Sequence, residues 1–199
     1  MMGTKLFIKN MVCDRCIMVV KNQLEEAGLN PTSIELGVIE LAEDEVSPEQ
    51  HEQAKLKLES VGFELLEDRK SQTIEAIKTA VIELIHRRND DDIKLKLSDH
   101  IASTLRYDYN YLSSQFSEAE GITIEQYAIQ QRIERVKELL AYGELSLKEI
   151  AYDLGYSSVA ALSGQFKKVM QITPSAWKAG NSTRKPLDKV GKDKPTRQS

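Results

Sequence analysis

Cys13 and Cys16 are the two cysteines of the 199-residue sequence, and two residues separate them. Thiolates at this spacing can bind soft ions such as Cu(I) and Zn(II), or can exchange with disulfides. A structural zinc site usually takes four ligands, and His51, His86 and His100 show no ligand spacing relative to the pair. Two thiolates alone therefore suit linear Cu(I), or a site that a partner protein completes.

The cysteines lie between a predicted strand and a predicted helix. Leu6 and Ile8 alternate with polar residues, which predicts a strand, and a helix is expected from about Asp14 to Ala27. Gly28 follows where helices commonly end. Because the backbone dipole at a helix N-terminus favours thiolate, we expect both thiols to have a lowered pKa.

The remaining apolar pattern of residues 1–67 predicts a small α+β domain. Its order of strand, helix, strand, strand, helix, strand is that of a ferredoxin-like βαββαβ sandwich. A hairpin around Gly37 is indicated by Ile34, Leu36, Ile39 and Leu41. A helix is predicted to start at Ser47 and Pro48 and to end at Gly62, and its apolar face carries Ala54, Leu58 and Val61. The last strand is indicated by Phe63, Leu65 and Leu66.

Residues 3–67 resemble the heavy-metal-associated domain of copper chaperones and metal-transporting ATPases. The matching residues are Met11, Cys13 and Cys16 of its Met-x-Cys-x-x-Cys motif, and Gly62 and Phe63 near its opposing loop. Asn10 departs from the family, which usually has glycine there. The resemblance implies a site for Cu(I) or another thiophilic ion at Cys13 and Cys16, and a metal-exchange partner. The alternative is a retained scaffold that binds no metal.

An internal repeat is the strongest organisational signal in the rest of the chain. Polar residues 68–71 are predicted to be a linker, and a helix with Ile74, Ile77, Val81 and Leu84 on one face follows. The repeated residues are Ile101, Ala102, Leu105 and Tyr107, which recur 49 positions later as Ile150, Ala151, Leu154 and Tyr156, and Leu112, Phe116, Ile122, Thr123 and Tyr127, which recur 50 positions later as Leu162, Phe166, Ile172, Thr173 and Trp177. Each copy predicts a helix, a short turn and a second helix.

One long helix, Thr123 to Tyr142, is predicted between the two copies. Thr123 and Gln126 form a capping box at its start, and Gly143 ends it. At about 1.5 Å per residue it would be roughly 30 Å long, close to the ~34 Å repeat of DNA. A rigid spacer of this length could present two recognition helices to successive segments of one major groove.

Residues 97–178 resemble the DNA-binding domain of the AraC/XylS family of transcription regulators. The resemblance lies in Gly121-Ile-Thr-Ile-Glu-Gln-Tyr127, Arg132, Leu139-Leu140, Leu147-Lys-Glu-Ile-Ala151, Leu154-Gly-Tyr156, Phe166-Lys167-Lys168 and Thr173-Pro174. It implies an all-α domain of two helix-turn-helix units, here assigned to residues 68–177, with double-stranded DNA as partner and RNA polymerase as a second candidate partner. Arg106 replaces the glycine that is usual in the first turn.

The resemblance also implies which residues face DNA. In the first recognition helix these are Asn110, Ser113 and Ser114, and Tyr109 is expected to assist. In the second they are Ser158, Val159, Ala160, Ala161 and Gly164, with phosphate contacts from Lys167 and Lys168. Since Val159, Ala160, Ala161 and Gly164 lack side-chain donors and acceptors, the second helix would contact thymine methyl groups or only dock on the backbone.

Charge and composition constrain the class of protein. The net charge is −4, but residues 178–199 carry 7 Lys or Arg against 2 acidic residues, which predicts a disordered basic tail, either simply solvated or attracted to DNA phosphates. No apolar run approaches the roughly 20 residues of a membrane helix, and the N-terminus does not look like a signal peptide. We therefore expect a cytoplasmic protein without membrane contact. The sequence makes no prediction of oligomeric state.

Three functions stay open from the sequence. The first is a sequence-specific DNA-binding regulator modulated by a thiophilic metal. The second is a soft-metal carrier or interaction protein whose helix-turn-helix domain no longer reads sequence, and the apolar positions 159–161 motivate it. The third is a thiol-disulfide enzyme, but the cysteines lack the aromatic and proline neighbours of such enzymes. No carboxylate pair, nucleophile triad or glycine-rich phosphate loop stands out, so no enzymatic activity is expected.

Overall fold

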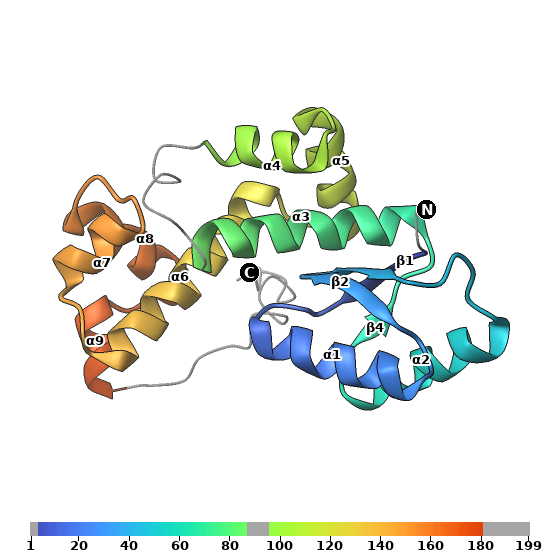
Figure 1. Cartoon of the computed structure of the whole chain (residues 1–199). Coiled ribbons are helices and arrows are strands. Elements are labelled where there is room, and N and C mark those ends of the chain that lie inside the picture. Colours follow the sequence, from blue (N-terminus) through green and yellow to red (C-terminus); the bar gives the residue numbers. More distant parts are fainter. Residues whose placement is uncertain (1–3, 87–95, 181–199) are drawn as a thin grey trace, which may run out of the picture. The chain divides into compact units, whose positions relative to one another are not determined.

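The computed structural model describes residues 4–86 and 96–180 (Figure 1). The elements follow in the order β1 (Lys5–Lys9), α1 (Asp14–Glu26), β2 (Pro31–Glu35), β3 (Val38–Leu41), α2 (Pro48–Ser60), β4 (Glu64–Leu65), α3 (Arg69–His86), α4 (Leu97–Leu105), α5 (Tyr109–Glu120), α6 (Ile124–Tyr142), α7 (Leu147–Asp153), α8 (Val159–Met170) and α9 (Pro174–Gly180). Most of the predicted basic tail, residues 181–199, lies outside the described residues.

The chain divides into two compact units, Met1–Thr79 and Ala80–Ser199. Helix α3 contributes residues to both units. The predicted linker 68–71 is therefore wrong, because α3 begins at Arg69 and the Asp68 carboxylate accepts the Ser71 backbone N–H at 2.8 Å. An acidic residue ahead of a helix supplies an acceptor for the unsatisfied N–H groups of the first turn, so this polar stretch starts a helix.

The first unit has the predicted ferredoxin-like topology. Its antiparallel sheet has the order β2-β3-β1-β4, with Leu6 opposite Ile39 in the register. Helices α1 and α2 lie on one face of the sheet, and the start of α3 runs along the other (Figure 1). Leu6, Ile8 and Ile39 are buried, as their alternation predicts, but Val61 is 43% exposed because α2 ends before it.

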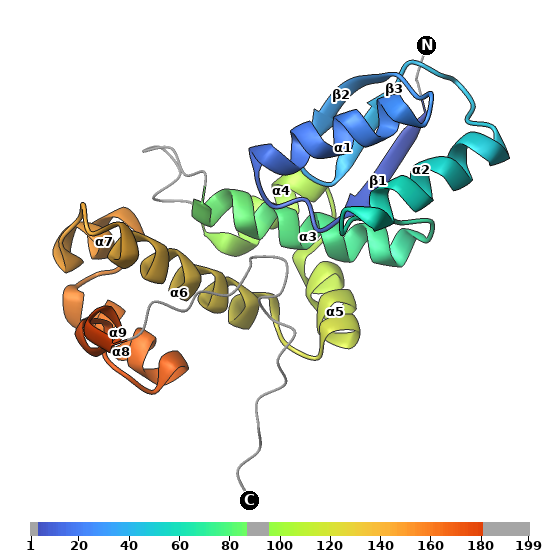
Figure 2. The same cartoon turned by 90° about the horizontal axis from the view of Figure 1, so that it is seen from below.

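The second unit contains the two predicted helix-turn-helix hairpins, α4–α5 and α7–α8, with α6 between them (Figure 2). Their cores are equivalent. The Phe116 and Tyr127 rings lie 5.6 Å apart in the first copy, and Phe166 and Trp177 lie 6.5 Å apart in the second. All four are at most 2% exposed. The repeat in the sequence is therefore a repeat of core packing.

Helix α6 connects the hairpins as a capped rod about 28 Å long at ~1.5 Å per residue. The predicted Thr123 capping box forms, and Gly143 ends the helix with φ +73°. Lys137 is 2% exposed, and its Nζ lies 2.8 Å from both carboxylate oxygens of Glu134 and 5.9 Å from the Trp177 ring centre. A buried charge needs such partners, so this pair and the apolar packing both fix the rod.

Candidate functional site

The exposed face of α5 presents Asn110 and Ser114 one helical turn apart. Asp108 caps the helix, and its carboxylate accepts the backbone N–H groups of Asn110 and Tyr111 at 2.9 and 3.2 Å. Ser113 is half-buried. Asn110 can donate to and accept from a base edge, and a serine hydroxyl can do either. Of the three predicted polar readers of α5, Asn110 and Ser114 are therefore exposed, whereas Ser113 is only partly so.

Tyr109 has a different environment from the one expected for a DNA contact. It is half-buried, and its hydroxyl donates a hydrogen bond to Glu125 in the first turn of α6. Burial raises the pKa of the Tyr109 phenol, and the bond lowers the pKa of the Glu125 carboxyl. Tyr109 therefore ties α5 to α6, and its hydroxyl is already engaged.

The exposed face of α8 is small and apolar over its first two turns. Ser158 caps the helix, its Oγ accepting the Ala161 N–H at 3.1 Å. Val159 is only partly exposed and packs against the core of the second hairpin, so it does not point outward as predicted. Ala160, Ala161 and Gly164 are exposed, and the space around Gly164 would admit a Cβ without contact within 4 Å.

Lys167 and Lys168 are exposed in the last turn of α8. Lysine on an exposed helix end is a point charge that suits a phosphate. The structure brings these two cations to the same helix as the small residues Ala160 and Gly164. The second hairpin therefore combines an exposed face of small apolar residues with positive charge at the end of α8.

Sequence reasoning passed over an aromatic pair at the first turn. Tyr107 and Tyr111 are 58% and 51% exposed, and their ring centres lie 5.8 Å apart. In the second copy the equivalent of Tyr107, Tyr156, turns inward and bonds Gln165 at 2.5 Å. The only signal in the sequence was the loss of symmetry, since Tyr111 aligns with Ala161.

Comparison with known proteins finds a family match within the second unit. Residues 101–180 match a family model described as a helix-turn-helix domain. The chain is 33% identical over 102 residues to the uncharacterised HTH-type transcriptional regulator YtdP of Bacillus subtilis, and 30% over 88 residues to the regulatory protein PocR of Salmonella typhimurium. It is 28% identical over 121 residues to the Msm operon regulatory protein of Streptococcus mutans.

Those matches are partial on both sides. They cover 51%, 44% and 61% of this chain, but 13%, 28% and 42% of the three regulators. Among solved structures, the C-terminal domain of AraT, a response regulator from Geobacillus stearothermophilus, is 26% identical with a TM-score of 0.47 over 56% of this chain and 88% of that one. The DNA-binding domain of AdpA in complex with a target DNA is 24% identical with a TM-score of 0.43, over 54% and 89%.

The thiol pair lies where the sequence predicts, at the start of α1. Cys13 precedes the helix, Cys16 is in its first turn, and the Sγ atoms are 3.3 Å apart. The expected lowering of the Cys16 pKa is wrong. Burial raises the pKa of the Cys16 thiol, and this outweighs the backbone N–H groups near it, which act in the opposite direction. Burial thus favours the protonated form of the Cys16 thiol.

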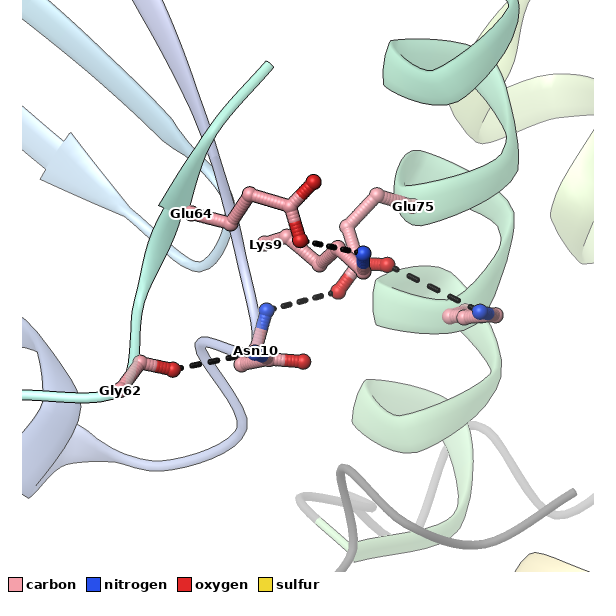
Figure 3. Close-up of polar contacts among 6 residues, drawn as sticks. Lys9, Asn10, Gly62, Glu64 and Glu75 are labelled. Carbon is pink, nitrogen blue, oxygen red and sulfur yellow. Dashed lines mark hydrogen bonds and ion pairs between the residues drawn. The ribbon is translucent and has the colours of Figure 1, made fainter. Parts of the chain in front are cut away.

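A polar network holds the loop that leads to the cysteines (Figure 3). Asn10 donates its backbone N–H to Glu75 Oε1 on α3 and its Nδ2–H to the Gly62 carbonyl, both at 3.0 Å. Lys9 pairs with Glu64 at 2.5 Å. Asn10 has φ +73°, the left-handed conformation that glycine favours and asparagine tolerates. Asparagine therefore tolerates this turn and adds a side-chain bond to the Gly62 carbonyl.

The described residues limit what else the site can contain. Over residues 4–86 and 96–180, no group of three or more His, Cys, Asp or Glu side chains could hold a metal ion. Two thiols fit a soft ion that accepts two sulfur ligands, or one whose remaining ligands come from elsewhere. In the same part of the chain, no helix is long and apolar enough to cross a membrane.

Proposed function

We propose that this chain is a sequence-specific DNA-binding transcription regulator of the AraC type. The observation that carries the proposal is the pair of equivalent hairpins on one capped rod, in a segment that matches a helix-turn-helix family. The relatives named above are regulators that are longer than this chain, so the activity of the whole protein is our inference. Asn110 and Ser114 on α5 would read base edges. The small exposed face of α8 would approach DNA closely, and Lys167 and Lys168 at its end would contact phosphates.

Selection from a random library of DNA duplexes tests this directly. Full-length protein should enrich a motif from the library, and Asn110→Ala should weaken binding to that motif while leaving the fold intact by circular dichroism. Ser103→Ala is a matched control, because Ser103 is an exposed residue of α4 whose hydroxyl donates to the His100 carbonyl within the same helix. Failure to enrich any motif would contradict sequence-specific binding.

The finer proposal is that a thiophilic ion such as Cu(I) modulates this regulator. Cys13 and Cys16 would hold the ion, which when bound supplies a positive charge that links two thiolates. Cysteine binds such an ion as the thiolate, and burial raises the pKa of the Cys16 thiol, so the apparent affinity should rise with pH. Met11 is 1% exposed and belongs to the core, so it serves packing.

Contacts within the first unit suggest how the thiol loop would act on a distant segment. The Asn10–Glu75 bond ties the loop to α3, and the Glu75 and Lys78 side chains are each 12% exposed. Helix α3 continues into the second unit, where His86 Nδ1 lies 3.8 Å from Glu138 Oε2 on α6. A shift of the loop would thus be passed to α3 through a hydrogen bond to a mostly buried carboxylate.

Cu(I) titration against a chromophoric chelator separates this proposal from metal carriage alone. Wild type should bind one ion, Cys13→Ser with Cys16→Ser should bind none, and the ion should change the affinity for the selected motif. Glu75→Ala should keep the ion and lose the change in DNA affinity, whereas Glu52→Ala on the exposed side of α2 should keep both. Tight Cu(I) binding with no effect on DNA would favour the carrier function instead.

A further inference from the structure

The two helix-turn-helix turns of this chain differ at one position that the repeat makes equivalent. Gly155 occupies the second turn with φ +71°, and Arg106, 49 residues earlier, occupies the first with φ +58°. A left-handed backbone is strained for a residue with a Cβ, and glycine is the residue that avoids the strain. Strain that persists at one copy of a repeat points to a role for the side chain.

The Arg106 side chain is available for an external partner. It is exposed, and among residues 4–86 and 96–180 no hydrogen bond or ion pair engages its guanidinium. The nearby Asp108 accepts the two backbone N–H groups of the α5 cap through Oδ1, and it makes no ion pair with Arg106 among the described residues. A planar, always-charged guanidinium with five donors matches a phosphate group well.

Two tyrosines extend this feature toward α5. The exposed rings of Tyr107 and Tyr111 lie in tilted contact, and Tyr111 is next to Asn110 on the exposed half of the helix. This mutual contact limits the freedom of both rings, so less entropy is lost when they contact a partner. The second copy has no such exposed aromatic pair, because Tyr156 turns inward and Ala161 takes the place of Tyr111.

We propose that Arg106, Tyr107 and Tyr111 form a DNA-backbone site at the first turn, with Arg106 on a phosphate and the tyrosine pair against the adjoining sugars. The proposal rests on the proposed function and adds a contact that the second repeat, with Gly155, Tyr156 and Ala161 at the aligned positions, does not supply. DNA fits better than an acidic protein surface, because the site adjoins Asn110 on the helix whose exposed face carries base-reading groups. Tyr109, with its hydroxyl on Glu125, takes no part.

Salt-dependent binding to a mixed-sequence duplex of about 40 base pairs tests the phosphate contact without knowledge of the operator. Each phosphate contact contributes about 0.9 to the slope of log affinity against log salt concentration. Arg106→Gly should lower the affinity roughly 3- to 10-fold near 0.1 M salt and reduce the slope by about that amount. Its thermal stability should stay the same or rise, since the strain is relieved.

Three further variants make the result specific. Arg106→Lys should keep the slope. Tyr107→Ala with Tyr111→Ala should lower the affinity and leave the slope unchanged, because no charge is lost. Gln171→Gly is the matched control: Gln171 also has a left-handed backbone, φ +62°, but carries no charge and lies at the far end of α8. It should change neither affinity nor slope.

The outcomes separate the two levels of the account. If wild type shows no salt-dependent duplex binding, the proposed function itself fails. If wild type binds and Arg106→Gly binds with the same slope and affinity, the backbone site is wrong and the regulator proposal stands. If Arg106→Gly lost binding to an acidic protein partner but bound DNA as wild type does, the backbone site would also be wrong.

Discussion

The two hairpins have the same interior and different exteriors. Leu112 and Phe116 in α5 are as buried as Leu162 and Phe166 in α8. On the outer face, the aligned positions pair Asn110 with Ala160, Tyr111 with Ala161, Ser114 with Gly164 and Glu118 with Lys168. The first hairpin therefore presents hydrogen-bonding and aromatic groups, and the second presents small residues followed by cations.

The difference shows how one scaffold can divide the work of DNA binding. Packing fixes only the inward positions of a helix, so the outward ones are free to diverge. Donors and acceptors discriminate between base pairs, whereas cations attract any sequence. We infer that α5 contributes most of the specificity and that α8 contributes close, nonspecific approach.

The largest expected effect tests whether the interiors are equivalent. Phe116→Ala and Phe166→Ala should each destabilise the domain by about 3–5 kcal/mol, because each empties a fully buried ring position. Denaturant unfolding followed by circular dichroism measures both values. If one substitution lowers the free energy of unfolding by less than half as much as the other, the two cores are not equivalent.

Asn110→Ala gives the first hairpin the residue that the second already has at the aligned position. We expect affinity for the selected motif to fall by about 1–3 kcal/mol, because a side chain that bonds a base edge is removed. Fluorescence anisotropy with the motif and a scrambled duplex measures the change. Equal weakening on both duplexes would show that Asn110 does not read sequence.

Lys167→Ser and Lys168→Ser address the second hairpin. Each should weaken binding to the motif and to the scrambled duplex alike, and each should reduce the salt slope by about 0.9, as expected for one phosphate contact. Anisotropy titrations over a range of salt concentrations provide the slopes. If only the motif is affected, α8 reads bases and the division of work is wrong.

Gly164→Ala has the smallest expected effect and probes how closely α8 approaches DNA. Since Gly164 lies in the helix and a Cβ there would have no contact within 4 Å, the free protein should gain about 0.5–1 kcal/mol of stability. Affinity for DNA should fall a few-fold because the added methyl occupies the close interface. Unchanged affinity with raised stability would mean that α8 stays away from the groove.

Local signals in the sequence predicted much of this structure. The capping boxes at Thr123 and Ser146 form with the residues that their spacing indicates, and the repeat gave the buried rings of both hairpins. These features depend on contacts within a few residues or on periodicity, which a sequence displays directly.

What the sequence could not predict depends on contacts between distant residues. The Tyr109 hydroxyl turns to Glu125 because α6 returns beside α5, and Val159 turns inward because of the core beneath it. The Cys16 pKa depends on how deeply the thiol is buried, which is a property of the folded unit. Periodicity identifies the exposed half of a helix, but it does not say which exposed groups already have partners.

Hydroxyl-radical footprinting of the selected motif tests most directly whether both hairpins bind one duplex. The account predicts two protected stretches about 10 base pairs apart on one face of the DNA, with Asn110→Ala weakening one and the Lys167 and Lys168 substitutions the other. A single protected stretch, or two on opposite faces, would contradict it.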